Sequence, residues 1–253
     1  MKSVAFTALP GLPEIAAGAD LPQLIAAAVE RAGLTPAPFD VVVVAQKIVS
    51  KAEGCVVDLR TVTPSPRGLE LAATTRKDPR LVEVVLSESQ EVLRAVPNVL
   101  IVRHRLGYVM ANAGVDRSNV PAADQDRVLL LPEDPDASAA RLRHELMTRW
   151  QVPVAVLISD SFGRAWRHGV VNVALGVAGL PSILDRRGEY DREGRALEMT
   201  EVALADAIAA GAALVMGEAN EGTPVVIARG LEWTASERNG AALLRPMEQD
   251  LFR

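Results

Sequence analysis

The sequence predicts an α+β fold, or a mixed α/β fold, rather than a barrel. Segments typical of strands and helices alternate irregularly along the 253 residues instead of repeating as strand–helix–strand units. The clearest strand is the run of four valines at 41–44, because branched side chains are stiff at χ1 and suit a strand buried on both faces. The clearest helix is the alanine-rich segment 199–217.

The chain shows no internal repeat and no linker. Without a Gly/Ser/Pro-rich joint there is no position at which to divide it into separate domains. We therefore expect a single domain over residues 1–253. Two closely packed subdomains within it would also fit the sequence.

The first half of the chain alternates short apolar runs with amphipathic segments. Its predicted elements are, in order, a strand at 4–9, a helix at 21–32, the valine strand opened by Asp40, helices at 69–75 and 80–95, and a strand at 98–103. The polar segment QKIVSKAEG (46–54) follows the valine strand directly, and two prolines at 64 and 66 form a turn before the two helices. Residues 109–127, which contain asparagines, acids and a glycine, predict a surface loop.

The second half contains the most apolar segments. Its predicted elements are, in order, a strand at 128–131, a helix from 134 to 150, a buried strand at 153–158, a small-residue strand at 170–180, the helix at 199–217 and a strand at 224–228. Asp134 or Asp136 would cap the helix that starts there. The polar segments SDSFGR (159–164) and DRRGEYDREGR (185–195) are expected as loops between these elements.

Composition excludes several classes of protein. A hydrophobic content of 49% with 23% charged residues is ordinary for a soluble enzyme, and a net charge of −5 argues against a nucleic-acid partner. Cys55 is the only cysteine, so no intrachain disulfide forms, and the three histidines are too scattered for a local zinc motif. Prolines break the N-terminal apolar stretch, and no apolar run approaches the ~18 residues of a spanning helix. We expect a cytoplasmic protein with no membrane partner.

Three acidic residues each lie in a polar, glycine-bearing stretch beside an apolar run: Asp116 in NAGVDRSN, Asp160 in VLISDSFGR and Glu218 in LVMGEANEG. Loops of this kind place groups that hold phosphates and hard cations such as Mg²⁺ or Mn²⁺. Taken alone, Asp116 and Asp160 are better explained by turns or helix caps. Glu218 is the stronger signal, because an unpaired charge at the end of a very apolar helix is unfavourable unless it is solvated, paired or metal-bound.

Basic residues lie close to two of these features. Lys47 and Lys51 follow the valine strand, and the ammonium group suits a nucleotide phosphate, although a pair of solvated surface lysines is the alternative. Arg164, Arg167 and His168 follow Asp160 and suit phosphates or carboxylates, with a surface ion-pair loop as the alternative. Since the chain contains no GxxxxGK[ST], GxGxxG or GxSxG motif, any nucleotide would bind at a nonstandard site.

The segments GLPEI, VSKAEG, NAGVDRSNV, SDSFGR, RHGVVNVALGVAG and MGEANEG follow one another in this order. With them the chain closely resembles the coenzyme F420-0:L-glutamate ligase family, the F420 γ-glutamyl ligases, from about residue 6 to about residue 235. The resemblance implies the family's own fold, a homodimer, and a GTP-dependent enzyme that adds L-glutamate to F420-0 and extends the product through γ-linkages. It also implies two divalent ions, Mg²⁺ or Mn²⁺, together with K⁺. Some relatives carry a C-terminal reductase-like domain, which we do not expect here.

Carried onto this sequence, the resemblance implies that Asp116 and Asp160 bind one divalent ion and that Ser161 and Glu218 serve the second. It implies a nucleotide site lined by Leu12, Pro13, Glu14, Ile15, Gln46, Lys47, Lys51 and Asn119. Ser161 stands where relatives often have threonine, so the hydroxyl is kept. The acidic Glu14 lies in a segment that can be apolar in relatives, and we expect only backbone contact there.

A free carboxylate is a poor electrophile. We therefore predict that GTP converts the F420-0 carboxylate to an acyl phosphate, from which the amine of glutamate displaces phosphate. The candidates for contacting the acidic part of F420-0 or the incoming glutamate are Arg164, Arg167 and His168. No general base is assigned. Two alternatives stay open: a metal-dependent nucleotide phosphohydrolase, which needs no acceptor, and a noncatalytic nucleotide-binding protein.

Overall fold

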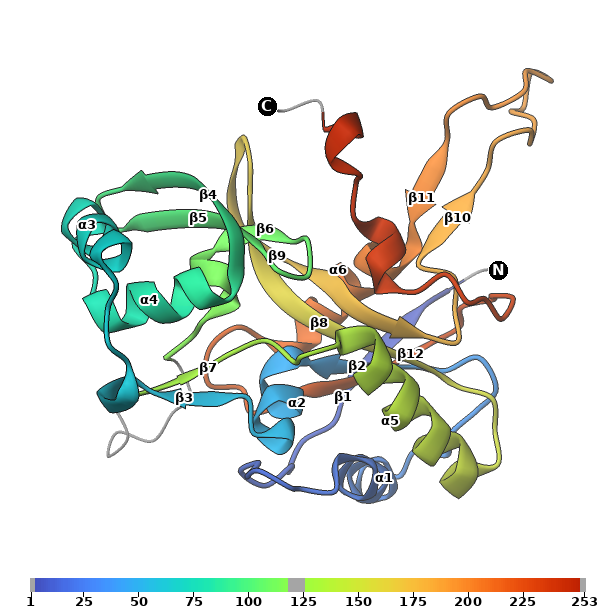
Figure 1. The fold of residues 1–253 in the computed structure, drawn as a ribbon. Helices are drawn as coiled ribbons and strands as arrows, with labels where there is room; N and C mark the ends of the chain where they lie inside the picture. Colours follow the sequence, from blue (N-terminus) through green and yellow to red (C-terminus); the bar gives the residue numbers. More distant parts are fainter. Residues whose placement is uncertain (1–2, 118–125, 251–253) are drawn as a thin grey trace.

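A computed structural model describes residues 3–117 and 126–250 of the chain. Its centre is a five-stranded mixed sheet in the larger of two lobes (Figure 1). The strands are, in spatial order, β1 (Ala5–Ala8), β12 (Val225–Arg229), β2 (Val41–Ala45), β8 (Ala155–Arg164) and β9 (Arg167–Ala178). Strands β2 and β8 are parallel, and the other neighbouring pairs are antiparallel. The architecture is thus mixed α+β, as predicted.

Helices cover both faces of this sheet. One face packs against α1 (Leu21–Arg31), α2 (Gln46–Glu53) and α5 (Pro135–Trp150), and the other packs against α6 (Leu204–Met216). The side chains of β2 and β8 alternate between the two hydrophobic cores: Val156 and Ile158 belong to the first, whereas Ala155 and Leu157 belong to the second. The valine strand is therefore buried on both faces, which confirms the prediction from its four consecutive branched residues.

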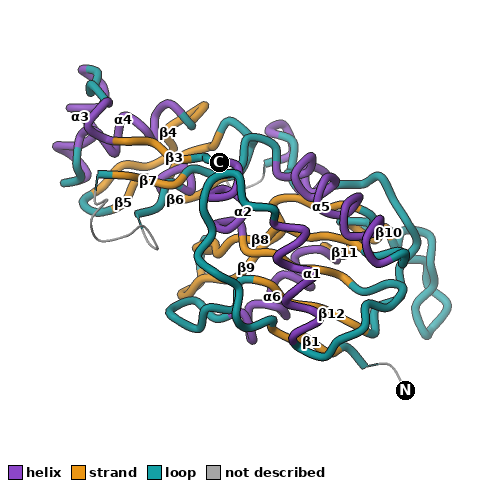
Figure 2. The backbone as a smooth tube through the Cα atoms, turned by 90° about the horizontal axis from the view of Figure 1, so that it is seen from below, coloured by secondary structure: helices purple, strands orange, loops and turns teal. Residues whose placement is uncertain are grey.

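The smaller lobe has a hydrophobic core of its own. It contains the antiparallel strands β4 (Ser89–Val96), β5 (Val99–His104) and β6 (Val109–Ala111), with α3 (Pro66–Thr75) and α4 (Pro79–Ser87) packed on them. A two-stranded ribbon of β3 (Val56–Asp58) and β7 (Arg127–Leu129) joins the lobes. Figures 1 and 2 both show this lobe beside the five-stranded sheet.

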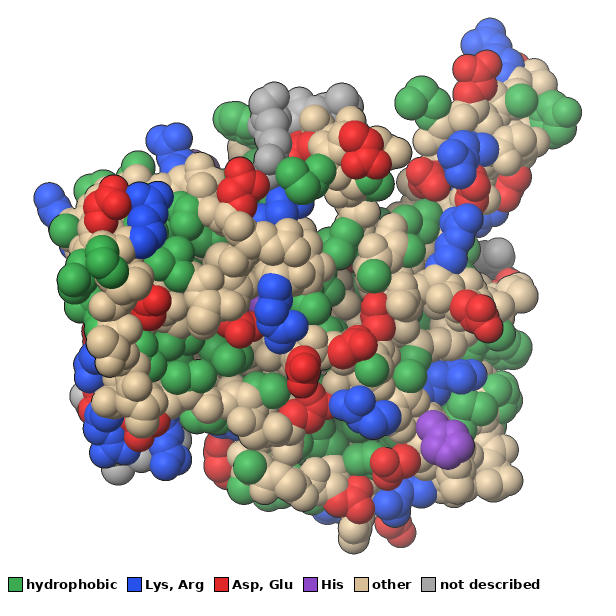
Figure 3. Space-filling model, viewed as in Figure 1, with side chains coloured by type: hydrophobic (Ala, Val, Ile, Leu, Met, Phe, Trp, Pro, Cys, Tyr) green, Lys and Arg blue, Asp and Glu red, His purple; other side chains and the backbone are tan. Residues whose placement is uncertain are grey.

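A two-stranded arm projects from the larger lobe. It consists of β10 (Ile183–Asp185) and β11 (Glu201–Ala203), and the segment 185–195, expected as a loop, leads to its tip (Figure 1). Figure 3 shows charged side chains of both signs gathered on the arm. Short 3₁₀ turns complete the described chain at Leu59–Thr61, Asn112–Gly114, Gly240–Leu243 and Met247–Gln249.

Several predicted elements are wrong in extent. The surface loop expected at 109–127 begins with a strand, because residues 109–111 pair with β5 as β6. The helix expected at 80–95 ends at Ser87, because residues 89–96 pair with β5 as a strand. The strand expected at 153–158 continues to Arg164, because SDSFGR pairs with β9 instead of forming a loop. The helix expected from 199 begins at Leu204, because residues 201–203 pair with β10. Across the described residues, no helix combines the length and apolarity needed to cross a membrane.

Candidate functional site

A cavity of about 350 Å³ lies at the carboxyl end of β2, beside Ser159, Asp160 and Ser161 in the middle of β8. Open α/β sheets commonly bind ligands beyond the carboxyl ends of their parallel strands. The N-terminal loop, the β2–α2 junction, β8 with β9, and the segment after α6 all contribute to the walls. The lining side chains that matter below are Glu14, Gln46, Lys47, Lys51, Ser159, Asp160, Ser161, Asn172, Glu218 and Glu221.

The structure brings most of the predicted site residues together. Seven of the eight residues predicted for the nucleotide line the cavity, namely Leu12, Pro13, Glu14, Ile15, Gln46, Lys47 and Lys51. The predicted cation ligands Asp160, Ser161 and Glu218 line it as well. Segments separated by up to two hundred residues of sequence thus meet in one space, while the roles of these residues stay predictions.

Both lysines of the cavity are paired with carboxylates. Lys47 Nζ lies 2.7 Å from Asp116 Oδ2, and Lys51 Nζ donates to Glu14 Oε1. Asp116 does not line the cavity itself but reaches it through Lys47, and its own backbone exchanges two hydrogen bonds with Leu129. The side chain of Glu14, for which only backbone contact was expected, therefore has a definite partner.

The first turn of α2 faces the cavity. Its N-cap is Ala45, whose side chain cannot accept a hydrogen bond, and Ala45, Lys47 and Ile48 all line the cavity. A helix N-terminus presents backbone N–H groups and partial positive charge, which together favour an anion. The Gln46 amide fixes this turn, because its Nε2 donates to Ser50 Oγ at 2.5 Å and to the Leu130 carbonyl at 3.1 Å.

Asp160 is the acid whose environment is most perturbed. Burial raises the pKa of Asp160 to about 6. The negative charges of Asp116 and Glu218 raise the pKa further, whereas the Ser161 N–H and the Lys47 ammonium lower it. The three acids named from the sequence are therefore close enough to interact electrostatically, and a bound cation would relieve their repulsion.

Asp160 and Ser161 point to opposite faces of the sheet. Side chains alternate between the two faces along β8. Asp160 therefore points to the α2 face, as Val156 and Ile158 do, and Ser161 points to the α6 face, as Ala155 and Leu157 do. Lys47 and Asp116 lie on the α2 side, whereas Glu218 follows α6. Two groups of oxygen atoms consequently flank the same strand.

These oxygen atoms fit a hard divalent cation. Carboxylate, hydroxyl and amide oxygens are the ligands that Mg²⁺ and Mn²⁺ prefer. Ser159 Oγ and Asn172 Oδ1 are buried in the cavity wall and have no hydrogen-bond partner among the described residues. No group of three or more His, Cys, Asp or Glu residues in 3–117 and 126–250 is arranged around a single metal position. A cation here would therefore need neutral oxygen ligands as well as carboxylates.

The loop that carries Glu218 is held by a second acid. Gly217 has φ of +78°, and a Cβ there would come within 2.2 Å of Glu221 Cδ, so a side chain at 217 is disfavoured twice. Glu221 Oε2 accepts the Ala219 N–H at 2.8 Å. The sequence prediction missed Glu221, Ser159 and Asn172. Ser159 could have been found because it lies two residues before Ser161 and so shares its face of the strand, whereas finding Asn172 requires knowing the register between β8 and β9.

Arg164, Arg167 and His168 lie away from the cavity. They occupy the exposed β8–β9 turn, where Arg164 Nη2 donates to the His168 carbonyl, and none of the three is among the described residues that line the cavity. The cause is the length of β8, since four extended residues beyond Asp160 carry the chain roughly 13 Å. Their contact with a substrate stays a prediction that this cavity does not support.

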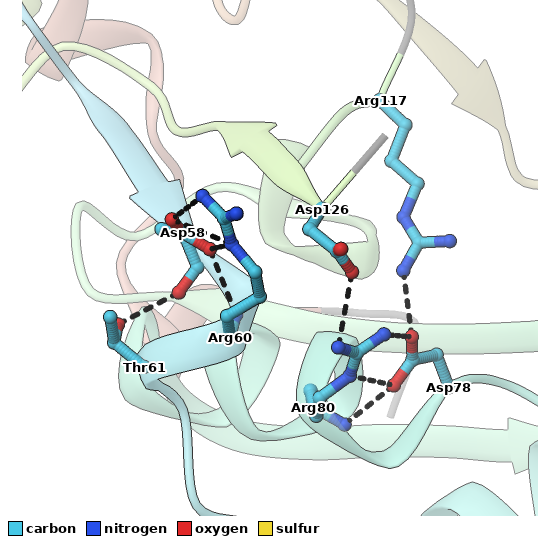
Figure 4. Close-up of polar contacts among 7 residues, drawn as sticks. All are labelled: Asp58, Arg60, Thr61, Asp78, Arg80, Arg117 and Asp126. Atoms are coloured by element: carbon cyan, nitrogen blue, oxygen red, sulfur yellow. Dashed lines mark hydrogen bonds and ion pairs between the residues drawn. The ribbon is translucent and has the colours of Figure 1, made fainter. Parts of the chain in front are cut away.

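Asn119 lies outside the described residues, but the residues that flank its segment are anchored. Figure 4 shows Arg117 paired with Asp78 at 3.0 Å and Asp126 paired with Arg80 at 3.1 Å, both at the start of α4. Arg80 and Asp78 also pair with each other at 2.8 Å. Hydrogen bonds from Arg80, together with one from Arg117, hold the pKa of Asp78 well below its usual range.

Comparison with known proteins gives matches over nearly the whole chain. The model of a family described as F420-0:Gamma-glutamyl ligase matches residues 11–230, a range that contains every residue lining the cavity. A coenzyme F420:L-glutamate ligase of Methanothermobacter thermautotrophicus is 45% identical over 252 residues, covering 99% of each chain. Proteins of the same name from Methanopyrus kandleri and Methanocaldococcus jannaschii are 47% and 44% identical, covering 93% and 85% of this chain and 92% and 84% of their own.

Proposed function

The chain belongs to the F420-0:gamma-glutamyl ligase family, and we propose that it uses GTP to join L-glutamate to coenzyme F420-0 and then extends the product through γ-linkages. Membership makes it a ligase of F420 biosynthesis. The choice of GTP, the intermediate and the extension are proposals, supported by the chemistry that the cavity offers.

The reaction needs activation of a carboxylate. In the first step a carboxylate oxygen of F420-0 attacks the γ-phosphorus of GTP, the bond to the leaving GDP oxygen breaks, and an acyl phosphate forms. In the second step the amine of glutamate attacks the carbonyl carbon, the C–O bond to phosphate breaks, and the nitrogen loses a proton as the amide forms. Catalysis of such transfers depends mainly on positioning and on neutralising charge.

One observation carries this proposal: two lysines, a helix N-terminus and a set of carboxylate and hydroxyl oxygens meet around one cavity. Lys47, Lys51 and the first turn of α2 supply fixed positive charge for the phosphates. Gln46 keeps that turn in place, and the Glu218 loop forms part of the cavity wall. Arg164, Arg167 and His168 would contact a substrate only where it passes the exposed β8–β9 turn.

Asp116 and Asp160 would hold one divalent ion, Mg²⁺ or Mn²⁺, and Ser161 with Glu218 a second, and when bound these ions would neutralise charge on the transferring phosphoryl group. A monovalent K⁺ and a homodimer, both expected from the family resemblance, complete the proposal, together with a cytoplasmic location, which is expected from the sequence composition. The ion pairs at Lys47 and Lys51 imply that both lysines change partners when phosphates bind.

The test is incubation of the purified protein with F420-0, GTP, L-glutamate and Mn²⁺, followed by mass spectrometry for glutamylated products and a phosphate assay. We expect both products, with phosphate release dependent on both acceptors. Lys51→Ala should lower kcat/KM for GTP, whereas Lys77→Ala, a lysine of the smaller lobe, should not. Phosphate release without acceptors would indicate the hydrolase instead, and GTP binding without any product would indicate a noncatalytic protein.

A further inference from the structure

We propose that Asn172 and Ser159 are additional ligands of a divalent cation that binds beside Ser161 and Glu218. The inference rests on the proposed function, because the cation belongs to its phosphoryl chemistry, and it extends the ligand set to residues in the cavity wall. Burial, register and donor chemistry each support it.

The first support is burial without a partner. Ser159 is 2% exposed and Asn172 is 5% exposed, yet Ser159 Oγ and Asn172 Oδ1 have no hydrogen-bond partner among the described residues. Buried polar side-chain atoms are nearly always paired, so an exception needs a cause. Both residues line the cavity, and so a ligand within it can supply the missing contact.

The second support is the strand register. Asn172 on β9 lies directly opposite Ser161 on β8, so the two side chains share one face of the antiparallel pair, with Cβ atoms roughly 4.5–5.5 Å apart. Ser159 precedes Ser161 by two residues and points to the same face. This is the face covered by α6, the helix that ends just before Glu218. The three side-chain oxygens therefore converge on the side where Glu218 enters.

The third support is donor chemistry. Hard divalent cations take six or more oxygen ligands, including hydroxyl and amide oxygens besides carboxylates. Within the described chain the acids alone do not form a group of three around one position. Oxygens other than those of the acids would therefore complete the shell of a cation bound here, and Asn172 Oδ1 and Ser159 Oγ are buried oxygens that can do so. A phosphate group would instead need the Asn172 amide to donate.

Titration of the protein with Mn²⁺ alone, followed by the loss of the free Mn²⁺ signal in electron paramagnetic resonance, tests this without any turnover. Asn172→Leu and Ser159→Ala should each weaken Mn²⁺ binding about tenfold or more. Asn172→Asp, which keeps an oxygen and adds charge, should bind Mn²⁺ as tightly as wild type or more tightly. Ser182→Ala is the matched control, since Ser182 Oγ is also buried with no hydrogen-bond partner in residues 3–117 and 126–250, but does not line the cavity.

A double-mutant cycle tests whether Asn172 and Glu218 hold the same ion. If they do, the loss of Mn²⁺ binding in the Asn172→Leu, Glu218→Gln double variant should differ from the sum of the two single losses, because ligands of one ion are energetically coupled. Additive losses, an Asn172→Leu protein that binds Mn²⁺ like wild type, weaker binding by Asn172→Asp, or no saturable binding by wild type would each overturn the proposal. If Asn172→Leu fails to fold, Asn172→Asp and Ser159→Ala decide.

The outcome is separable from that of the ligase proposal. Mn²⁺ binding that depends on Asn172 in a protein that makes no glutamylated product would keep the cation site and refute the ligase reaction. Glutamylation by wild type, together with Mn²⁺ binding that Asn172→Leu does not change, would keep the ligase reaction and refute the cation site.

Discussion

At the scale of single residues, Glu14 occupies the position of a ligand anion. Its carboxylate is 76% exposed and pairs with the Lys51 ammonium, which is 15% exposed. A phosphate that binds Lys51 must displace this carboxylate and is also repelled by it. Glu14→Gln should therefore tighten GTP binding, by about 1.4- to fivefold, because an exposed ion pair is worth roughly 0.2–1 kcal/mol.

Calorimetric titration with GTP at low salt measures this effect. Glu30→Gln, an exposed acid on α1 outside the cavity, should leave the GTP affinity unchanged. Weaker GTP binding by Glu14→Gln would show instead that the Glu14 side chain supports the nucleotide.

His104 predicts a pH dependence of stability. Burial lowers the pKa of His104 to about 4, and its Nδ1 accepts the Leu106 N–H at 2.9 Å, so the folded protein holds the neutral ring. Between pH 6.5 and 4 the unfolded chain binds more protons at this residue than the folded chain does. Stability present above pH 6.5 is therefore lost as the pH falls, by up to roughly 3 kcal/mol from this group.

His104→Asn keeps an acceptor for the Leu106 N–H but does not titrate, so it should show a shallower loss of unfolding free energy between pH 6.5 and 4. Urea unfolding at a series of pH values measures the difference from wild type. His144→Asn, at an exposed histidine of α5, should follow the wild-type curve. Identical curves for wild type and His104→Asn would contradict the prediction.

At the scale of elements, Asp136 joins α5 to two other segments. Its Oδ1 accepts the N–H groups of Val177 at 2.8 Å and Gly240 at 2.7 Å, and its Oδ2 accepts that of Ala241 at 3.1 Å. Asp136→Ala should lower the unfolding free energy by about 1.5–3 kcal/mol, because hydrogen bonds to a charged group are lost and N–H groups are left unpaired. Asp134→Ala, which removes only an N-cap, should cost about 1 kcal/mol.

Thermal unfolding of both variants distinguishes the two effects. For a chain of this size, 1 kcal/mol corresponds to about 2–4 °C in Tm. A larger loss in Asp134→Ala than in Asp136→Ala would mean that the cap, and not the link between elements, stabilises this region.

The elements also show where sequence patterns succeed and where pairing overrides them. The valine strand and the α5 helix follow from local composition and a cap. Residues 89–96 continue a helical pattern, yet they form β4 because β5 offers a partner, and such tertiary pairing commonly overrides weak propensity. The polar composition of SDSFGR is typical of a loop, yet the segment is part of β8, and Ser159, Asp160 and Ser161 are strand residues that line the cavity.

The candidate site divides in a similar way. Residues within the ordered motifs, such as Lys51 and Asp160, were found from the sequence. Ser159 and Asn172 were not, since a polar residue in an apolar strand gains meaning only when the register places it opposite Ser161. The hairpin residues Arg164 and Arg167 were expected near the site because they are close in sequence, but an extended strand separates them in space.

At the scale of the whole molecule, the fold joins opposite charges beside the cavity. Asp116 comes from the segment between β6 and β7, and Lys47 comes from α2, yet their charged atoms lie 2.7 Å apart. A cation that takes Asp116 removes one carboxylate partner of Lys47 and favours pairing of the ammonium with a phosphate. A phosphate that takes Lys47 leaves Asp116 to the cation, so each ligand should favour the other, and by linkage the effect is reciprocal.

We therefore predict that GTP and Mn²⁺ together raise Tm by more than the sum of their separate shifts. Couplings of this kind amount to about 1–3 kcal/mol, which corresponds to roughly 2–12 °C for a chain of this size. Since Mn²⁺ and GTP also associate in solution, the informative comparison is between proteins: Lys47→Met should reduce the excess shift, whereas Lys77→Met should keep it. Equal excess shifts in wild type and Lys47→Met would mean that the Lys47–Asp116 pair does not couple the two ligands.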